Sequence, residues 1–327
     1  MSAHLADLST RIAGVRQLGA VVNAMRGIAS GRARRAREQL RAVDVHEATV
    51  VSAIGASLSA TPAPTAPGPA APAPPQRPGA TRSAVVAFCA EQGFAGAFSE
   101  RVLDALRPRP GDGASRLLIV GSRGVELAAA RGLAVHWSSP MPSHSNGIVR
   151  LADRVADALY RLLGSDDPER IDVAFTVLPA GAAPVVERQH LYPLDLDALE
   201  RRTASLRREG AGGAPLTTLA PSRLLAALTE DYVFARLCHA ALHAFAAENE
   251  ARMQTMAAAH RQIERRLAAL EARQRRVRQD AITEEIVELA AGEAASRQRR
   301  DDAPRAGRSR GAAPEPATIA GCKPSLS

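Results

Sequence analysis

Two dense groups of arginines lie towards opposite ends of this chain, and their side chains are suited to bind negatively charged groups. The formal net charge is +8 and the only lysine is Lys323, so nearly all of the positive charge is arginine. The planar guanidinium donates paired hydrogen bonds to carboxylates and phosphates, which predicts an acidic partner, either protein or nucleic acid. A solvated helix face and a genome rich in G and C would also produce such runs. The two groups are Arg32, Arg34, Arg35, Arg37 and Arg41, and Arg261, Arg265, Arg266, Arg273, Arg275, Arg276 and Arg278.

A glycine-bearing segment in the middle of the chain is a second candidate for chemistry. Gly121-Ser122-Arg123-Gly124 follows an apolar run and opens a helical pattern, which is where phosphate-binding turns occur. The segment lacks the lysine of a P-loop and the full G-x-G-x-x-G pattern. We therefore interpret it as a tight turn and expect neither a cofactor nor another small-molecule ligand.

The histidines and cysteines do not form a recognisable catalytic or metal site. His239 and His243 are one helical turn apart, a spacing that suits zinc, but no glutamate follows His239 and no third ligand is evident. Packing within a helical pair is the better interpretation. The three cysteines are far apart, so we expect no disulfide framework, and a reducing compartment. We also find no supported Ser-His-Asp or paired-carboxylate arrangement, and expect no catalytic or metal-binding residue.

The arginine groups must be positioned by two long helices. Residues 5–54 lack proline and carry apolar residues at three- and four-residue steps, which predicts one helix with a narrow apolar stripe. Four glycines weaken this helix, so it needs a partner. Residues 222–300 also lack proline and keep an apolar spacing near the helical period. The two helices are predicted to form a long antiparallel coiled coil.

Between these helices, short apolar runs alternate with helical patterns. Runs at 84–89, 116–121 and 171–178 are typical of strands, and patterns at 98–106, 125–130 and 148–163 are typical of helices. Such alternation predicts an α/β fold with a small parallel, Rossmann-like sheet. The expected organisation is an N-terminal coiled-coil helix (1–60), a Pro/Ala-rich linker (61–82), an α/β domain (83–194), a loop (195–221), a C-terminal coiled-coil helix (222–298) and a disordered basic tail (299–327).

Composition agrees with a helical, soluble protein. Hydrophobic residues make up 46% of the chain and aromatic residues only 3%, which suits close packing of Ala, Val, Leu and Ile. No run of 18 uncharged apolar residues occurs, and Asp7 interrupts the N-terminal turns. We therefore expect neither a signal peptide nor a transmembrane helix.

Two separated motifs resemble F-type ATP synthase gamma subunits. The segment RIAGVRQLGAVVNAMRGIASGRARRAREQL is similar to the opening helix of that family. Near the other end, ARMQTM and RQDAITEEI resemble the family segments A-R-M-x-A-M and R-Q-x-x-I-T-x-E-I, at the family separation. GFAGAFS is similar to G-L-C-G-G-F-N. Departures include Glu91 and Gln92 before this glycine motif and Arg275 in place of an asparagine. The resemblance covers roughly residues 5–295 and suggests a divergent member of an alternate bacterial type.

The resemblance implies a mechanical role for the chain. It would be the central rotor shaft that couples ion-driven rotation of a membrane ring to ATP synthesis or hydrolysis, with no active site of its own. The implied partners are the alpha and beta subunits of the ATPase hexamer, the epsilon subunit and the membrane c-ring, on the cytoplasmic face of the bacterial inner membrane. The coupling ion, proton or sodium, is selected by membrane subunits. The implied partner-binding residues are Met25, Arg26, Arg34, Arg35, Arg252, Met253, Arg278, Gln279, Thr283 and Glu285.

Nucleic-acid binding by a basic coiled coil is the alternative function. The net charge and the arginine-rich tail permit it. However, the arginines lack interleaved aromatic residues that would stack on bases, and nucleic-acid binding would leave the two spaced motifs unexplained. We therefore favour the rotor and expect no nucleic-acid partner.

Overall fold

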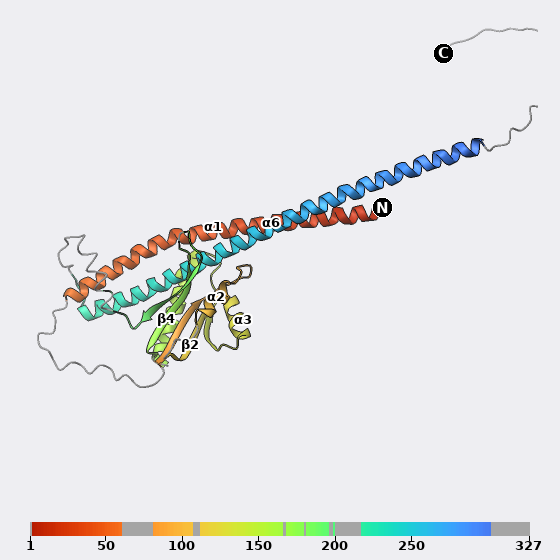
Figure 1. Ribbon diagram of the computed structural model, residues 1–327. Helices are drawn as coiled ribbons and strands as arrows, with labels where there is room; N and C mark the ends of the chain where they lie inside the picture. Colours follow the sequence, from red (N-terminus) through yellow and green to blue (C-terminus); the bar gives the residue numbers. More distant parts are fainter. Residues whose placement is uncertain are drawn as a thin grey trace, which may run out of the picture. The chain divides into compact units, whose positions relative to one another are not determined.

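Two long helices and one five-stranded sheet form most of the chain in a computed structural model. It describes residues 2–60, 81–106, 112–165, 168–179, 181–195, 199 and 217–301. Helix α1 spans Ser2–Ala60 and helix α6 spans Pro221–Asp301, so both predicted long helices are present (Figure 1). Most of the predicted linker, loop and tail lies outside the described residues. Among the described helices, none combines the length and apolarity needed to cross a membrane.

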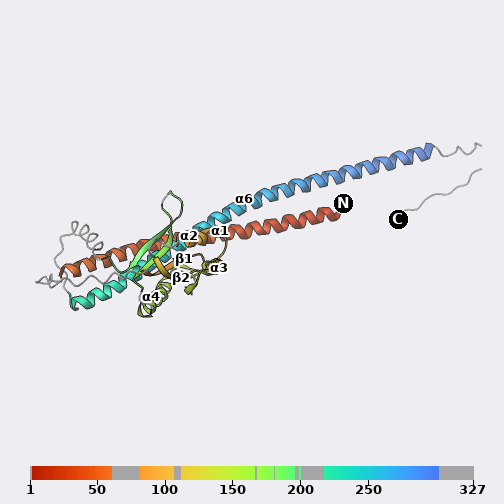
Figure 2. The same cartoon turned by 60° about the horizontal axis from the view of Figure 1, so that its bottom comes forward.

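Contacts divide the chain into two compact units. The larger unit is Ala13–Leu267, and the smaller contains Met1–Ile12 and Ala268–Ser327. Within the larger unit, α1 and α6 lie side by side (Figures 1 and 2). An Arg37–Glu250 ion pair of 2.7 Å and an Arg236–Glu47 pair of 3.3 Å join them. The later of the two α1 residues, Glu47, pairs with the earlier of the two α6 residues, Arg236. The two helices therefore run antiparallel, as predicted.

The sheet has the strand order β3-β2-β1-β4-β5. Neighbouring strands β3, β2, β1 and β4 are parallel, whereas β5 is antiparallel to β4. The predicted parallel sheet is therefore confirmed, and β5 adds an antiparallel strand that was not predicted. The strands are β1 (Thr81–Phe88), β2 (Asp112–Val120), β3 (Val135–Ser139), β4 (Arg170–Val177) and β5 (Val185–Tyr192). The shorter helices are α2 (Phe98–Asp104), α3 (Ser122–Ala130), η1 (Ser145–Gly147) and α4 (Ile148–Ser165).

Helices cover both faces of the sheet, because successive side chains of a strand point to opposite faces. On one face, Val86 and Phe88 of β1 belong to a core that also contains residues of α4, α1 and α6. On the other face, Ala87 packs with residues of α2 and α3. The central strand β1 is thus buried on both faces, which explains its continuous apolar run.

A buried carboxylate joins the antiparallel strand to its neighbour. Asp172 of β4 is fully buried and accepts hydrogen bonds from Arg170 (2.9 Å) and Arg188 (2.7 Å), and His190 lies 3.2 Å away. Burial alone would raise the pKa of Asp172. Hydrogen bonds from Arg170 and His190 and the charge of Arg188 outweigh this effect, so its pKa is lowered. Two polar residues of β5, Arg188 and His190, therefore pair inward with Asp172.

The smaller unit contains the first turns of α1 and the part of α6 from Ala268 onward. Leu8 and Ile12 are buried, and Gln274 donates a hydrogen bond of 2.9 Å to Ser9. By contrast, every residue of α6 from Ile282 to Arg299 is exposed in this chain. Among the described residues, no second helix covers the end of the apolar stripe predicted through Ile286 and Leu289, and these two side chains are 60% and 68% exposed.

Replacing Gly27 of α1 by alanine is expected to raise the free energy of unfolding by about 0.5–1 kcal/mol, because glycine is costly inside a helix. A Cβ at Gly27 would have no neighbour within 4 Å. Urea unfolding followed by circular dichroism measures the change. Gly19→Ala is the matched control, since its Cβ would lie 3.3 Å from Ile263 and part of the gain would be lost. A destabilised Gly27→Ala variant would contradict this expectation.

Candidate functional site

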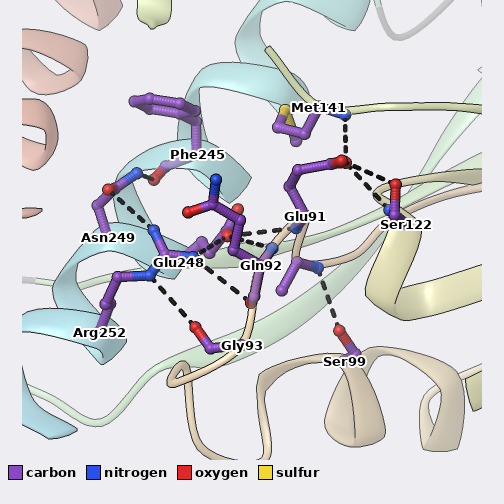
Figure 3. Close-up of polar contacts among 11 residues, drawn as sticks. Glu91, Gln92, Gly93, Ser99, Ser122, Met141, Phe245, Glu248, Asn249 and Arg252 are labelled. Atoms are coloured by element: carbon purple, nitrogen blue, oxygen red, sulfur yellow. Dashed lines mark hydrogen bonds and ion pairs between the residues drawn. The ribbon is translucent and has the colours of Figure 1, made fainter. Parts of the chain in front are cut away.

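The carboxyl end of β1 is the polar centre of the larger unit. After β1, residues 89–96 cross the edge of the sheet where α3 begins and pass close to α6 (Figure 3). The backbone N–H of Cys89 donates to Val120 (2.8 Å), and that of Arg123 donates to Ala90 (3.1 Å). These bonds join the end of β1 to β2 and to the start of α3.

Glu91 occupies the amino-terminal end of α3. Its carboxylate accepts hydrogen bonds from the backbone N–H of Ser122 (3.0 Å), the Ser122 hydroxyl (2.7 Å) and the backbone N–H of Met141 (2.8 Å) (Figure 3). A helix amino terminus attracts anions through its free N–H groups and its dipole. Here an internal carboxylate takes the position that a phosphate would take in a nucleotide-binding turn. The predicted tight turn at Gly121–Gly124 is confirmed, and the geometry gives it a structural role.

Glu248 and Arg252 of α6 bind the same segment from the other side. The Glu248 carboxylate accepts from Arg252 at 2.5 Å and from the backbone N–H groups of Glu91 (3.2 Å) and Gln92 (3.4 Å). Arg252 in turn donates to the carbonyl oxygens of Gly93 (3.3 Å) and Gln92 (3.5 Å). Figure 3 shows these side chains converging on residues 91–93. We call Glu91, Glu248 and Arg252 the clamp.

The α6 side of the clamp is buried. Glu248 is 2% exposed and Arg252 is 6% exposed. Burial raises the pKa of the Glu248 carboxyl, and the adjacent Arg252 and the two loop N–H groups offset part of this increase. Asn249, also buried, accepts from Arg252 (3.3 Å) and donates to the carbonyl oxygen of Phe245 (2.8 Å). Because so many hydrogen bonds converge on buried groups, removal of one partner would leave several others unsatisfied.

Arg252 is the one predicted partner-binding residue that is buried in this chain. Its guanidinium is already occupied by Glu248, Asn249 and the segment at 92–93. The neighbouring Met253 is half-buried. In the isolated chain, the geometry of Arg252 therefore supports an internal role in holding the clamp.

The remaining predicted site residues lie on helix surfaces. On α1, Met25 is half-buried, whereas Arg26, Arg34 and Arg35 are exposed. On α6, four exposed residues lie within two turns: Arg278, Gln279, Thr283 and Glu285. The Thr283 hydroxyl donates to the carbonyl oxygen of Gln279, 2.9 Å away, and the side chain of Gln279 is exposed to solvent.

Sequence reasoning did not identify Glu91 and Glu248 as functional residues. Glu91 was noted only as a departure from the family glycine motif. A signal for Glu248 was available, because a glutamate followed four residues later by an arginine stands next to the apolar run of α6. Nothing local pairs Glu248 with residues 91 and 92, which lie more than 150 positions earlier in the chain.

Two buried cysteines and a histidine pair are the other side chains of the larger unit that could carry chemistry. Burial raises the pKa of the Cys89 and Cys238 thiols to about 12, so neither is a nucleophile at neutral pH. His239 and His243 contact each other edge-on and both pack against Phe175 of β4, so they pack against the sheet and not only, as was predicted, against the second long helix. Across the described ranges, no group of three or more His, Cys, Asp or Glu side chains is arranged to hold a metal ion.

Comparisons with known proteins agree with this architecture. A family profile described as ATP synthase matches residues 4–295. The ATP synthase gamma chain of Frankia casuarinae is 27% identical over 303 residues, covering 89% of this chain and 97% of that protein. The gamma chain of Chlorobium limicola is 23% identical over 296 residues, covering 88% and 97%.

Solved structures show the same fold. A structure of the Euglena gracilis mitochondrial ATP synthase comprising OSCP, F1 and the c-ring contains a chain with a TM-score of 0.60 and 10% identity, covering 95% of this chain and 100% of that one. The rotor of the same synthase in another rotational state gives a TM-score of 0.55, covering 86% and 100%. Together with the family match over most of its length, these findings show that the chain belongs to the ATP synthase gamma-chain family.

Proposed function

We propose that this chain is the central rotor shaft of an F-type ATP synthase. It couples ion-driven rotation of a membrane ring to ATP synthesis or hydrolysis in a catalytic hexamer. The chain belongs to this family, and the observation that carries the proposal is the exposure of apolar side chains at the end of α6. Ile282, Ile286, Val287 and Leu289 are between 51% and 68% exposed there. Exposed apolar side chains along a helix are typical of a surface that another protein covers.

The proposed mechanism is differential contact. An asymmetric shaft touches three catalytic subunits differently at each rotational position, so each position stabilises a different conformation and nucleotide affinity. In this proposal the chain itself makes and breaks no bond, and the position of Glu91 in the glycine turn, where a phosphate would otherwise bind, supports it. We propose alpha and beta subunits, an epsilon subunit and a c-ring as partners. The location that follows is peripheral, on the cytoplasmic face of the bacterial inner membrane.

The larger unit also has an apolar surface that supports assembly with other subunits. A groove of about 520 Å³ lies between α4, the end of β5 and the start of α6. Its lining includes Leu159, Leu191 and Leu225. Exposed apolar grooves are costly in water unless a partner covers them. The net charge alone would also permit nucleic-acid binding, but the family match gives this alternative no support.

Co-expression with alpha and beta subunits tests the proposal. The expected result is a complex that remains intact in 0.5 M salt on size-exclusion chromatography and hydrolyses ATP. Binding to nucleic acid depends on counterion release and falls steeply with salt. A chain that bound DNA in this salt-sensitive manner and failed to join the hexamer would overturn the rotor assignment.

Reversing two charges on α1 tests the arginine face. Arg34→Glu/Arg35→Glu is expected to lower ATP-driven ion pumping of the assembled complex by about fivefold or more. Changing one partner of an ion pair costs more binding free energy at a protein interface than on a solvent-exposed surface. Both side chains are exposed, so stability of the free chain should change by no more than about 0.5 kcal/mol. Arg150→Glu on α4 is the control. Unchanged pumping by the double variant would remove these residues from the interface.

Truncating two polar side chains tests the exposed end of α6. Arg278→Ala/Gln279→Ala is expected to reduce ATPase activity of the assembled complex about fivefold, since both side chains present free donors to a partner. The nearby exposed Arg276 provides the control variant, Arg276→Ala, for which a smaller effect is expected. Full activity of the double variant would show that this face makes no functional contact.

A further inference from the structure

A pair of partly buried histidines lies where three elements of the larger unit meet. His239 and His243 of α6 have ring centroids 4.4 Å apart, and their Nε2 atoms are separated by 3.2 Å. Both rings also lie about 6 Å from Phe175 of β4, at 6.0 and 5.8 Å between centroids. The two imidazole rings therefore pack α6 against the sheet, at a position where aliphatic side chains usually make the contact.

Charged groups from each surrounding element face this pair. From α1, Asp44 lies 3.5 Å from His239 Nε2, and Glu47 pairs with Arg236 of α6. From β5, Glu187 acts electrostatically on both rings, and Gln189 contacts Arg236. The three carboxylates favour a charged imidazole, whereas Arg236 and the second histidine oppose it. Burial also disfavours the charged form of both rings. Whether the rings are neutral or charged therefore depends on which form their hydrogen-bonding geometry accommodates.

A neutral pair of rings fits this geometry, whereas a pair in which both Nε2 atoms carry a proton does not. A separation of 3.2 Å requires one Nε2–H to donate and the other Nε2 to accept. A proton added to the accepting Nε2 places two donors face to face. A proton added to Nδ1 of His239 places a donor on a buried atom that has no hydrogen-bond partner among the described residues. The first route breaks the hydrogen bond between the rings, and the second leaves a buried donor without an acceptor.

We propose that His239 and His243 form an acid-sensitive latch, which holds α6 against α1 and the β4–β5 edge at neutral pH and releases these contacts on acidification. The inference concerns the chain itself and does not depend on the proposed function. In a cell that becomes acidic, the latch would loosen the attachment of the α/β domain to its two helices.

The directions in which the two pKa values are shifted agree with this geometry. Burial, followed by the charge of Arg236, lowers the pKa of His239, and burial together with His239 lowers that of His243 to about 4. Unfolded histidine binds protons near pH 6.5. Because the unfolded chain then holds more protons than the folded chain, the free energy of unfolding falls as pH decreases from about 6.5 towards 4.

Proton uptake on unfolding tests the latch in the full-length chain. Urea unfolding at closely spaced pH values around 5.5 gives the number of protons bound. The wild type is expected to take up about one to two protons more than His239→Gln/His243→Gln, in which glutamine keeps hydrogen-bonding groups without a basic nitrogen. His46→Gln replaces an exposed histidine of α1 and is expected to behave as the wild type. Equal uptake by the double variant and the wild type would overturn the proposal.

A local measurement distinguishes the latch from general acid denaturation. Hydrogen exchange, corrected for intrinsic rates, should become faster at pH 5 in residues 44–51 and 236–243 before it does so in α4. Glutamine at both positions should abolish this difference. If the double variant does not fold, the single variant His243→Gln and the imidazole NMR titration of the wild type replace it. Histidine signals at 239 and 243 that titrate near pH 6.5 would refute the latch.

Discussion

Glu248→Ala is expected to lower the free energy of unfolding by about 3–5 kcal/mol, because it leaves the buried guanidinium of Arg252 without its carboxylate. The same change removes the acceptor for the backbone N–H groups of Glu91 and Gln92. Water reaches these groups poorly, since the side chain of Arg252 is only 7% exposed. A loss of this size is a large fraction of the stability of a typical domain.

Urea unfolding followed by Trp137 fluorescence measures this effect, because the single tryptophan lies on β3 of the sheet. Glu250→Ala is a matched control two residues away. Glu250 pairs with Arg37 at 2.7 Å, but their side chains are 19% and 48% exposed, so the expected loss is at most about 1 kcal/mol. Glu248→Gln keeps an acceptor and should fall between the two. A loss below about 1 kcal/mol for Glu248→Ala would show that the clamp does not stabilise the domain.

The sequence contained enough information for the long helices and the central strands. Absence of proline over residues 222–300 predicted α6 to within a few residues of its ends. Strands β1, β2 and β4 were identified because parallel strands are buried on both faces and form apolar runs. Strands β3 and β5 were missed because they are edge strands with polar side chains. In β5, residues such as Arg188 and His190 bind Asp172 of β4, a pairing that local periodicity does not encode.

The candidate site was less predictable than the fold. The exposed positions on α1 and α6 came from a family resemblance, and their partners are other chains. The clamp depends on contacts between residues more than 150 positions apart, such as Glu248 with residues 91 and 92. The end of the apolar stripe in α6 was misjudged for a related reason. Periodicity shows which face of a helix is apolar, but not where α1 ceases to cover it.

Gly121→Ala is expected to destabilise the chain by about 3–4 kcal/mol, because its backbone and its surroundings both exclude a side chain. Gly121 has a φ of +107°, which L-residues rarely adopt. A Cβ would lie 2.4 Å from the carbonyl oxygen of Cys89 and 2.8 Å from that of Ala90. Relief of this collision requires movement of the β1 end away from α3. That movement would stretch the Arg123-to-Ala90 hydrogen bond and withdraw Glu91 from the helix amino terminus.

The control for Gly121→Ala separates the collision from the backbone conformation. Gly132 also has a positive φ, +68°, but a Cβ there would meet no atom within 4 Å. Gly132→Ala should therefore cost only about 1 kcal/mol, the penalty of the left-handed conformation alone. Urea unfolding of both variants, followed by Trp137 fluorescence, gives the difference. Equal losses would mean that the close approach of β1 and α3 at the turn is not required. A larger loss for Gly121→Ala would show that this glycine permits the close approach of the β1 end to the start of α3.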